Sequence, residues 1–185
     1  MASVEAARTL DQLKRIELAL STRTTPLYRD LWVIGINVAL RISDLLSIKY
    51  SDIQDGRLKV REQKTGKVRD ILLNERAVQV IERRRKDHPE HVYLFESDAN
   101  RANRGTPVSR QIVGRVFRET GQRPDIKLNL GTHSLRKTRA RIMFESGIRI
   151  EEICKMLNHS SPVVTMTYLN IVQKDMDDLA TKFVL

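Results

Sequence analysis

The sequence lacks the features that would place it in a membrane or in an oxidising compartment. Cys154 is the only cysteine among 185 residues, which excludes an intramolecular disulfide and a zinc site built from several cysteines. No run of about 18 apolar residues occurs, so we expect no membrane-spanning segment. The opening MASVEAARTL has no basic region followed by an apolar run, so we also expect no signal peptide. These absences favour the reducing cytoplasm.

Acidic residues are fewer than basic ones. The chain has 33 Lys and Arg against 23 Asp and Glu, which gives a net charge of +10. Such an excess attracts polyanions, nucleic acid first. The alternative is an ordinary basic protein, because 41% hydrophobic and 30% charged residues suit any globular domain. Charge therefore favours a nucleic-acid partner but does not establish one.

No repeat, low-complexity segment or Pro/Gly-rich linker divides the chain, so we expect a single domain over residues 1–185. In the first part, Thr9 is the expected N-cap of a helix that runs to about Leu20, and Ser43 the N-cap of a short one. Between them, helical spacing predicts one buried face made of Leu27, Leu31, Ile34 and Val38.

The middle of the chain carries the strand signals. Residues 57–61 and 68–73 are predicted strands, and QKTGK between them indicates a β-hairpin. Residues 75–87 are predicted to be helical, and 92–95 are a third strand or a buried segment. A loop over 97–107 precedes a helix capped by Ser109, whose inner face would hold Ile112, Val113, Val116 and Phe117.

From Gly131 onward we expect successive helices. Thr132 is the predicted N-cap of the first, and Gly147 its C-cap glycine. Ser161 followed by Pro162 is typical of a helix start. Apolar residues at helical spacing predict one helix from Ile150, Ile153, Cys154 and Leu157, and a final one from Val172, Met176, Leu179 and Phe183. The predicted class is mainly α (α+β), a helical bundle with a small antiparallel sheet.

Some residues of this helical part could do chemistry. His133 and Arg136 are three residues apart near a helix N-terminus, where anions bind well. His159 lies at a helix–helix corner, where Asn158 can adopt a positive φ. Tyr168 is expected near the middle of the next helix. Taken singly, each is more simply a surface, capping or packing residue.

Two cations upstream are further candidates. Arg41 stands between Leu40 and Ile42, so we expect it to be partly buried and to need a partner, either Asp44 or a bound anion. Lys64 would lie at the hairpin tip, where a flexible cation reaches a ligand. Lys67 is equally available, and hairpin lysines are usually just solvated.

The carboxylates do not favour a metal-dependent nuclease. The densest cluster has positions i, i+2 and i+3 of one helix, which do not converge on a single ion; it consists of Asp175, Asp177 and Asp178. It is better interpreted as a solvated face. We therefore predict no metal and no cofactor.

Taken together, the six candidates resemble the tyrosine recombinase (phage integrase) family; in order they are Arg41, Lys64, His133, Arg136, His159 and Tyr168. The matching phrases are ALRISDLLSIKYSDI, KTGKVRDILL, THSLRKTRA and LNHSSPVVTMTYLNI, which extend roughly from Leu31 to Ile171. The pattern H-x-x-R, a histidine 23 residues on and a tyrosine nine further is specific. Asn158 departs from the family, which usually has glycine there.

The resemblance implies the family's catalytic-domain fold and a site-specific recombinase or integrase. Such an enzyme cleaves and rejoins DNA through a 3′-phosphotyrosyl intermediate, without metal or ATP. Tyr168 would be the nucleophile, and Arg41 and Arg136 would hold the non-bridging phosphate oxygens. The remaining implied roles are proton donation to the 5′-oxygen by Lys64, proton transfer with the tyrosine by His133, a phosphate hydrogen bond from His159, and support from Asp44.

The resemblance also implies partners. We expect double-stranded DNA, a monomer in solution, a tetramer on DNA, accessory DNA-bending proteins and a nucleoid-associated location. Further DNA-binding candidates, each of which is more simply part of a solvated face, are Arg110, Arg115, Arg118 and Lys137. The family's N-terminal core-binding domain is absent from this chain, which is then either a part of a longer protein or a single-domain member. The final helix would dock on a neighbouring protomer or on its own domain.

Two other functions remain open at this point. A non-catalytic regulator could keep the fold and bind duplex DNA through its basic face. A type IB topoisomerase-like enzyme could use the same tyrosyl chemistry to relax supercoils.

Overall fold

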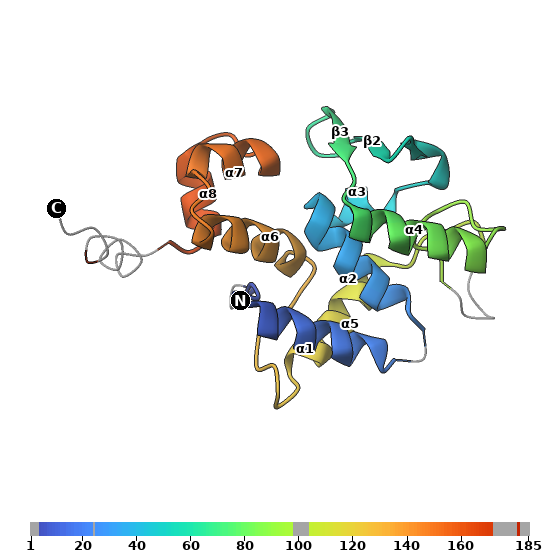
Figure 1. Cartoon of the computed structure of the whole chain (residues 1–185), viewed down its shortest axis with the longest axis horizontal. Helices are drawn as coiled ribbons and strands as arrows, with labels where there is room; N and C mark the ends of the chain where they lie inside the picture. The colour runs from blue at the N-terminus through green and yellow to red at the C-terminus, as the bar shows by residue number, and fades with distance from the viewer. Residues whose placement is uncertain (1–3, 24, 98–103, 172–180, 182–185) are drawn as a thin grey trace. The chain divides into compact units, whose positions relative to one another are not determined.

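The computed structural model describes residues 4–23, 25–97, 104–171 and 181. The chain divides into two compact units, Met1–Arg139 and Ala140–Leu185, each described below by itself (Figure 1). The expectation of a single domain stays a prediction. In chain order the elements are α1 Leu10–Ser21, α2 Leu27–Val38, α3 Ile42–Leu46, the 3₁₀ turn η1 Tyr50–Asp52, β1 Ile53–Gln54, β2 Arg57–Arg61, β3 Val68–Leu72, α4 Glu75–Asp87, α5 Arg110–Gly121, α6 Ser134–Glu145, α7 Ile150–Leu157 and α8 Pro162–Tyr168.

Helix α2 is the centre of the first unit. Its predicted face is buried, but so are Trp32, Val33 and Ile36, because other helices and the chain around them cover α2 on nearly all sides. The Trp32 ring meets Phe117 of α5 edge to face, with ring centroids 5.4 Å apart. This packing holds α2 in place, and α2 ends at Val38, just before the segment that carries Arg41.

A buried charge pair ties α4 to α2. Arg84 is 1% exposed, and its NH1 lies 3.3 Å from Oδ2 of Asp30, which is fully buried. The Nε of Arg84 donates to the carbonyl of Leu94 at 2.9 Å. Residues 92–95 form no strand: they contain a single bridge, Lys49 to Tyr93, and within them Leu94 and Phe95 are buried while Val92 is exposed. Asp30 also pairs with Arg83, so removing Asp30 would take the carboxylate from two arginines, one of which is buried.

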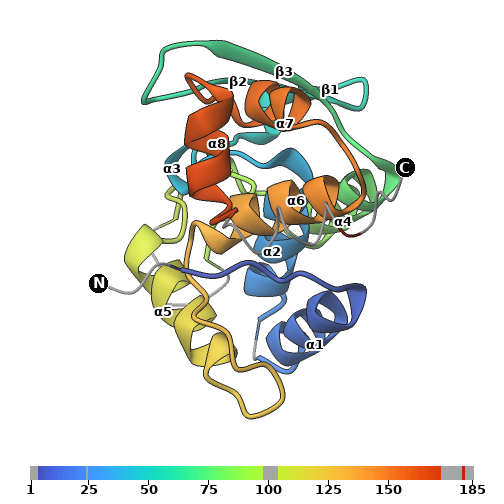
Figure 2. The same ribbon diagram turned by 90° about the vertical axis from the view of Figure 1, so that its left-hand side faces the viewer.

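The sheet has the antiparallel order β1-β2-β3, and Figure 2 shows the three strands side by side. The predicted hairpin is confirmed, with Arg57 opposite Leu72 and Arg61 opposite Val68. Strand β1 was not predicted. It joins β2 through Asp55 and Gly56, which have φ of 49° and 69°. An Asp-Gly pair favours this two-residue turn, so the signal was present in the sequence.

The second unit contains α7 and α8, which pack against each other (Figure 1). Asn158 ends α7 in the left-handed region, with φ 52° and ψ 47°, as predicted. The hydroxyl of Ser161 accepts from the Val164 N–H and Pro162 begins α8, also as predicted. Tyr168 is the last residue of α8, so the prediction that it lies near the middle is wrong: the helix is only seven residues long.

Most predicted helix ends are confirmed by their hydrogen bonds. Thr9 and Ser109 accept from the N–H groups three residues on, and Gly147 has φ 83° beyond the end of α6. Three predictions are wrong. The helix α3 begins at Ile42, so Arg41 and not Ser43 occupies its N-cap position. The helix α6 begins at Ser134, which places Thr132 two residues before it. Ile112 faces outward, at 38% exposure.

Two predicted features lie mostly or wholly outside the described residues. They are the loop over 97–107 and the final amphipathic helix, with its cluster Asp175, Asp177 and Asp178. Among the described residues, no helix is both long and apolar enough to cross a membrane.

Candidate functional site

Arg41 stands at the junction between α2 and α3. Its side chain is 19% exposed, and its NH1 lies 3.0 Å from Oε2 of Glu62. Asp44 was one predicted partner, but Oδ1 of Asp44 accepts the backbone N–H of Gln63 at 2.9 Å instead. The expected partial burial is therefore found. The partner comes from the β2–β3 connection and not from α3.

Glu62 was missed by the sequence reasoning. Its carboxylate is fully buried and also accepts from Thr65 Oγ1 at 2.7 Å and from Arg69 NH1 at 3.3 Å. A carboxylate amid a basic hairpin looks like a solvated residue. The signal that could have found it is alternation, because Leu58 and Val60 point inward and Glu62 is the next position on the same face.

Arg136 lies in the first turn of α6 and is 3% exposed. Its NH1 donates to the carbonyl oxygen of Ala39 at 2.5 Å. Ala39 ends α2 in the left-handed region, with φ 51°, and Arg41 follows it by two residues. The bond therefore brings the first turn of α6 to the segment that carries Arg41.

His133 precedes α6 directly, and part of its side chain is exposed. Crowding by protein removes water from the ring and lowers the pKa of His133 below its usual value. Nearby cations lower it further, in the order Arg110, Arg136, Lys137 and Arg41. The same contributions show that Arg41 and Arg136 both act on this ring. The lowered pKa favours the uncharged form of His133, whose imidazole can accept a proton.

Replacing Arg110 by glutamine is expected to raise the pKa of His133. Among the cations that lower the pKa of His133, Arg110 has the largest effect, and removing a like charge makes the imidazolium less unfavourable. A titration of the His133 ring by NMR measures the shift. Arg115→Gln is the matched control, because that arginine is exposed on the same helix and does not contribute. An unchanged pKa in Arg110→Gln would contradict this electrostatic account.

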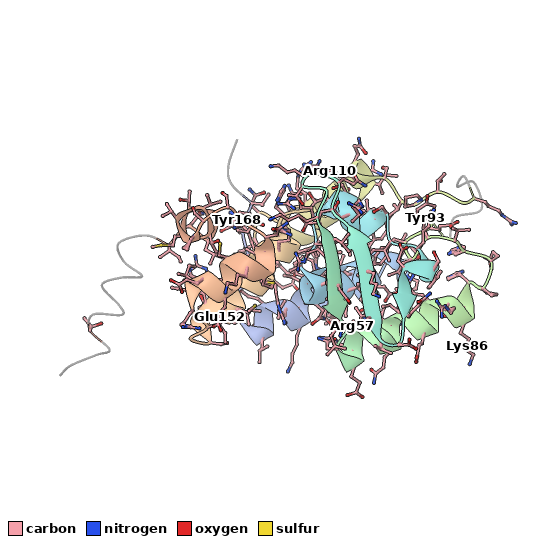
Figure 3. All side chains as sticks on the ribbon, turned by 90° about the horizontal axis from the view of Figure 1, so that it is seen from above. Arg57, Lys86, Tyr93, Arg110, Glu152 and Tyr168 are labelled. Atoms are coloured by element: carbon pink, nitrogen blue, oxygen red, sulfur yellow. The ribbon has the colours of Figure 1, made fainter. Side chains whose placement is uncertain are left out.

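The four DNA-binding candidates differ in exposure. Arg110, Arg115 and Arg118 are exposed on α5, and Figure 3 labels Arg110 at the start of that helix. Lys137 is 8% exposed, and its Nζ donates to the carbonyl of Val4 at 3.0 Å. Burial lowers the pKa of Lys137. This bond holds the N-terminal segment on α6, and a DNA contact by Lys137 stays a prediction.

Lys64 and Lys67 are both exposed in the connection between β2 and β3. The backbone carbonyl of Lys67 accepts from the N–H of Glu62 at 2.9 Å, so Lys67 stands where the hairpin closes. Lys64 lies in the chain between Glu62 and Lys67, nearer the tip of the β2–β3 hairpin. A proton-donating role for Lys64, with Lys67 as the alternative, stays a prediction.

In the second unit, His159 and Tyr168 are neighbours. Their ring centroids are 5.1 Å apart at an interplanar angle of 79°, and both side chains are half-buried. Nδ1 of His159 lies 3.0 Å from Oγ1 of Thr165, a fully buried residue one turn before Tyr168. Thr165 was also missed by the sequence reasoning. The signal that could have found it is its position three residues before Tyr168, on the same face of α8. Figure 3 labels Tyr168 at the end of α8.

One group of potential metal ligands occurs among the described residues. His88, Glu90 and His91 follow α4, and their ligand atoms lie within 4.8 Å of one another. Zinc requires ligands at about 2.0–2.3 Å, usually four of them in a structural site. Glu90 is 58% exposed, and the two imidazole rings are stacked in parallel with their centroids 4.6 Å apart. This arrangement does not point the ligand atoms at a common tetrahedral centre. We assign no metal to this group.

Comparison with known proteins shows which sequences and structures this chain is similar to. The sequence profile of the phage integrase family matches residues 9–174. The chain is 37% identical over 169 residues to the probable integrase/recombinase YoeC of Bacillus subtilis, covering 91% of this chain and 90% of that protein. It is 32% identical over 144 residues to the tyrosine recombinase XerA of Pyrococcus furiosus, covering 75% of this chain but 48% of that protein.

Solved structures share the fold. The XerA recombinase matches with a TM-score of 0.74 at 22% identity, over 97% of this chain and 66% of that one. A lambda integrase dimer bound to a COC′ core site matches with a TM-score of 0.67 at 22% identity, over 91% and 61%.

The fold and these relatives define an enzyme of the class that cleaves and rejoins DNA. The chain belongs to the phage integrase family, the tyrosine recombinases. It spans nearly all of YoeC and about half of the archaeal XerA. The expected family and fold class are confirmed. The individual roles of the site residues stay predictions.

Proposed function

We propose that the chain is a site-specific recombinase in which Tyr168 attacks the scissile phosphate. The bond from phosphorus to the 5′-oxygen breaks, leaving a 3′-phosphotyrosyl link and a free 5′-hydroxyl. The observation that carries the proposal is the gathering of Arg41, His133 and Arg136 at the end of α2. These three residue types are the ones that phosphoryl transfer to a tyrosine needs.

The two arginines would stabilise the phosphate. Its non-bridging oxygens gain charge density in the transition state, and a guanidinium donates parallel hydrogen bonds to such oxygens. Each arginine is oriented by a bond to the protein, Arg41 by Glu62 and Arg136 by Ala39. Orientation before binding matters because the site then needs little reorganisation. In this proposal fixed cations serve where other nucleases use a metal ion.

Proton transfers complete the proposed reaction. A tyrosine of pKa about 10 must lose its proton to attack, and neutral His133 is suited to take it. His159, beside the Tyr168 ring, would hydrogen-bond the phosphate. The 5′-alkoxide is a poor leaving group, and Lys64 would protonate it, with Lys67 as the alternative. Asp44 would support the site by holding the start of the Lys64 connection through Gln63.

Duplex DNA is the proposed partner. The net charge of +10 and the exposed arginines of α5 support it. The related lambda integrase has been solved as a tetramer bound to a Holliday junction, which supports a tetramer on DNA for this chain as well. A monomer in the absence of DNA, accessory DNA-bending proteins and a nucleoid-associated location stay predictions.

Selection of covalent complexes tests the function without a known site. The protein is mixed, in EDTA, with nicked duplexes of random central sequence whose cleaved strands lose a short fragment and cannot be resealed. We expect complexes that survive denaturing detergent, joined through the 3′ end of the DNA, and sequencing them yields the site.

The other outcomes separate the alternatives. DNA binding without any covalent complex would contradict the proposal and favour a regulator. Covalent complexes without sequence preference, together with relaxation of any supercoiled plasmid, would favour a topoisomerase-like enzyme. Cleavage that leaves free ends would exclude tyrosyl chemistry.

A further inference from the structure

We propose that Glu62 and Thr65 form a clamp that positions Arg41 and the Lys64 connection as one unit. The inference rests on the proposed function, because it concerns how two of the proposed site residues are placed. Neither Glu62 nor Thr65 contacts the phosphate in this proposal. Both are positioning residues.

A single carboxylate oxygen joins the two parts. Oε2 of Glu62 accepts from Arg41 NH1 at 3.0 Å and from Thr65 Oγ1 at 2.7 Å. Arg41 belongs to the α2–α3 junction, whereas Thr65 belongs to the β2–β3 connection. Loss of the Thr65 hydroxyl would therefore release the β2–β3 connection but leave Arg41 its bond to Glu62, whereas loss of the carboxylate would release both. Thr65 is also the direct neighbour of Lys64 in the chain.

The backbone of Glu62 holds the same connection. Its N–H donates to the carbonyl of Lys67 at 2.9 Å, and its carbonyl accepts from the N–H of Gly66 at 2.8 Å. Gly66 has a positive φ of 68°, which lets the chain turn back. With the Thr65 hydroxyl as a third point, the backbone around Lys64 is tied down. Only the lysine side chain must then be ordered when the substrate binds.

The Glu62 carboxylate lies between two guanidiniums. The carboxylate is fully buried, and Oε1 faces Arg69 NH1 at 3.3 Å while Oε2 faces Arg41. A buried carboxylate between two guanidiniums is stabilised, but removing its charge would leave two cations without their partner. Arg69 occupies the second oxygen, so the first is divided between Arg41 and Thr65.

Thr65→Val tests the connection to Lys64. Valine keeps the branched shape and removes the hydroxyl. In the ordinary reaction the bond from phosphorus to O5′ breaks and O5′ takes a proton from Lys64. A substrate with sulfur in place of O5′ releases a thiolate, which needs no proton because thiols have a pKa of about 8.5.

We expect Thr65→Val to slow adduct formation about tenfold or more on ordinary DNA, within the roughly 10²–10⁴-fold that a positioned acid supplies. On the sulfur substrate the rate should approach that of the parent protein. Thr65→Ser, which restores the hydroxyl, should behave like the parent on both substrates.

Glu62→Gln tests the connection to Arg41. It should slow the reaction on both substrates, because the guanidinium loses its orientation and sulfur does not replace it. Asp70→Asn is the matched control, an exposed carboxylate on the same sheet that pairs with Arg57 at 2.8 Å. Thermal unfolding identifies a Glu62 variant that fails to fold, in which case the Thr65 variants decide.

The outcomes separate the clamp from the proposed function. If the parent protein forms no adduct, the proposed function fails. If the parent forms an adduct but Thr65→Val is as fast as the parent, or equally slow on both substrates, the clamp alone is wrong.

Discussion

Replacing Tyr168 by phenylalanine is expected to leave a folded protein that forms no covalent complex with DNA. The change removes one hydroxyl and keeps the ring, which meets His159 edge to face at 5.1 Å. Packing of the half-buried ring should therefore survive. Phenylalanine has no oxygen to attack phosphorus, so the covalent pathway is closed and not merely slowed. Denaturing electrophoresis with the selected nicked duplex measures the adduct.

The matched control is Tyr93→Phe. It makes the same change in a half-buried tyrosine of the first unit, whose ring lies under the Lys49 ammonium. Adduct formation should be that of the parent protein. DNA binding should also persist in Tyr168→Phe, because no cation is lost. An adduct formed by Tyr168→Phe at the parent rate would show that another residue is the nucleophile.

The parts of the fold that the sequence predicted well are those set by local chemistry. Thr9, Ser109 and Ser161 cap helices because their hydroxyls reach an N–H within the next turn. Asn158 adopts a positive φ because its short polar side chain tolerates that conformation. Such signals depend only on a few neighbouring residues, so one sequence suffices to find them.

The predictions that failed concern side chains whose partners or burial depend on segments far away in the sequence. The partner of Arg41 comes from a strand end 21 residues away, and the carbonyl that holds Arg136 is 97 residues away. Neither pairing can be predicted from the spacing of neighbouring residues in the sequence. Lys137 looked like one more surface cation, but the N-terminal segment covers it and Val4 takes its ammonium. Local patterns cannot show which exposed-looking cation another segment will bury.

The candidate site shows the same division. Order and spacing identified the residue types, because the resemblance to the family rests on them. The geometry that orients them rests on Ala39 and Glu62, neither of which was a candidate. Ala39 is a non-glycine residue at φ 51°, a conformation that costs about 1–2 kcal/mol. The turn at Ala39 directs its carbonyl oxygen to the Arg136 guanidinium. The strained backbone at Ala39 therefore helps to position Arg136.

Arg136→Lys should reduce the rate of adduct formation by about 10²–10³-fold, as loss of one transition-state donor does in other enzymes. Lysine keeps the positive charge but not the planar fork, which bonds the Ala39 carbonyl and would bond a phosphate oxygen in parallel. DNA affinity should change little, because affinity follows charge. Arg136→Ala should lower the rate further and reduce the salt dependence of binding by about one phosphate contact.

Single-turnover cleavage and salt-dependent binding separate these effects. Both variants also leave the Ala39 carbonyl without its arginine, which costs about 1–3 kcal/mol of stability, so rates are compared at a temperature where unfolding is absent. Arg123→Lys is the control, because that exposed arginine pairs with Asp125 on the surface, at 3.2 Å, and this variant should cleave DNA normally. A parent-like rate for Arg136→Lys would mean that charge alone is needed at this position. The fork held by Ala39 would then have no part in catalysis.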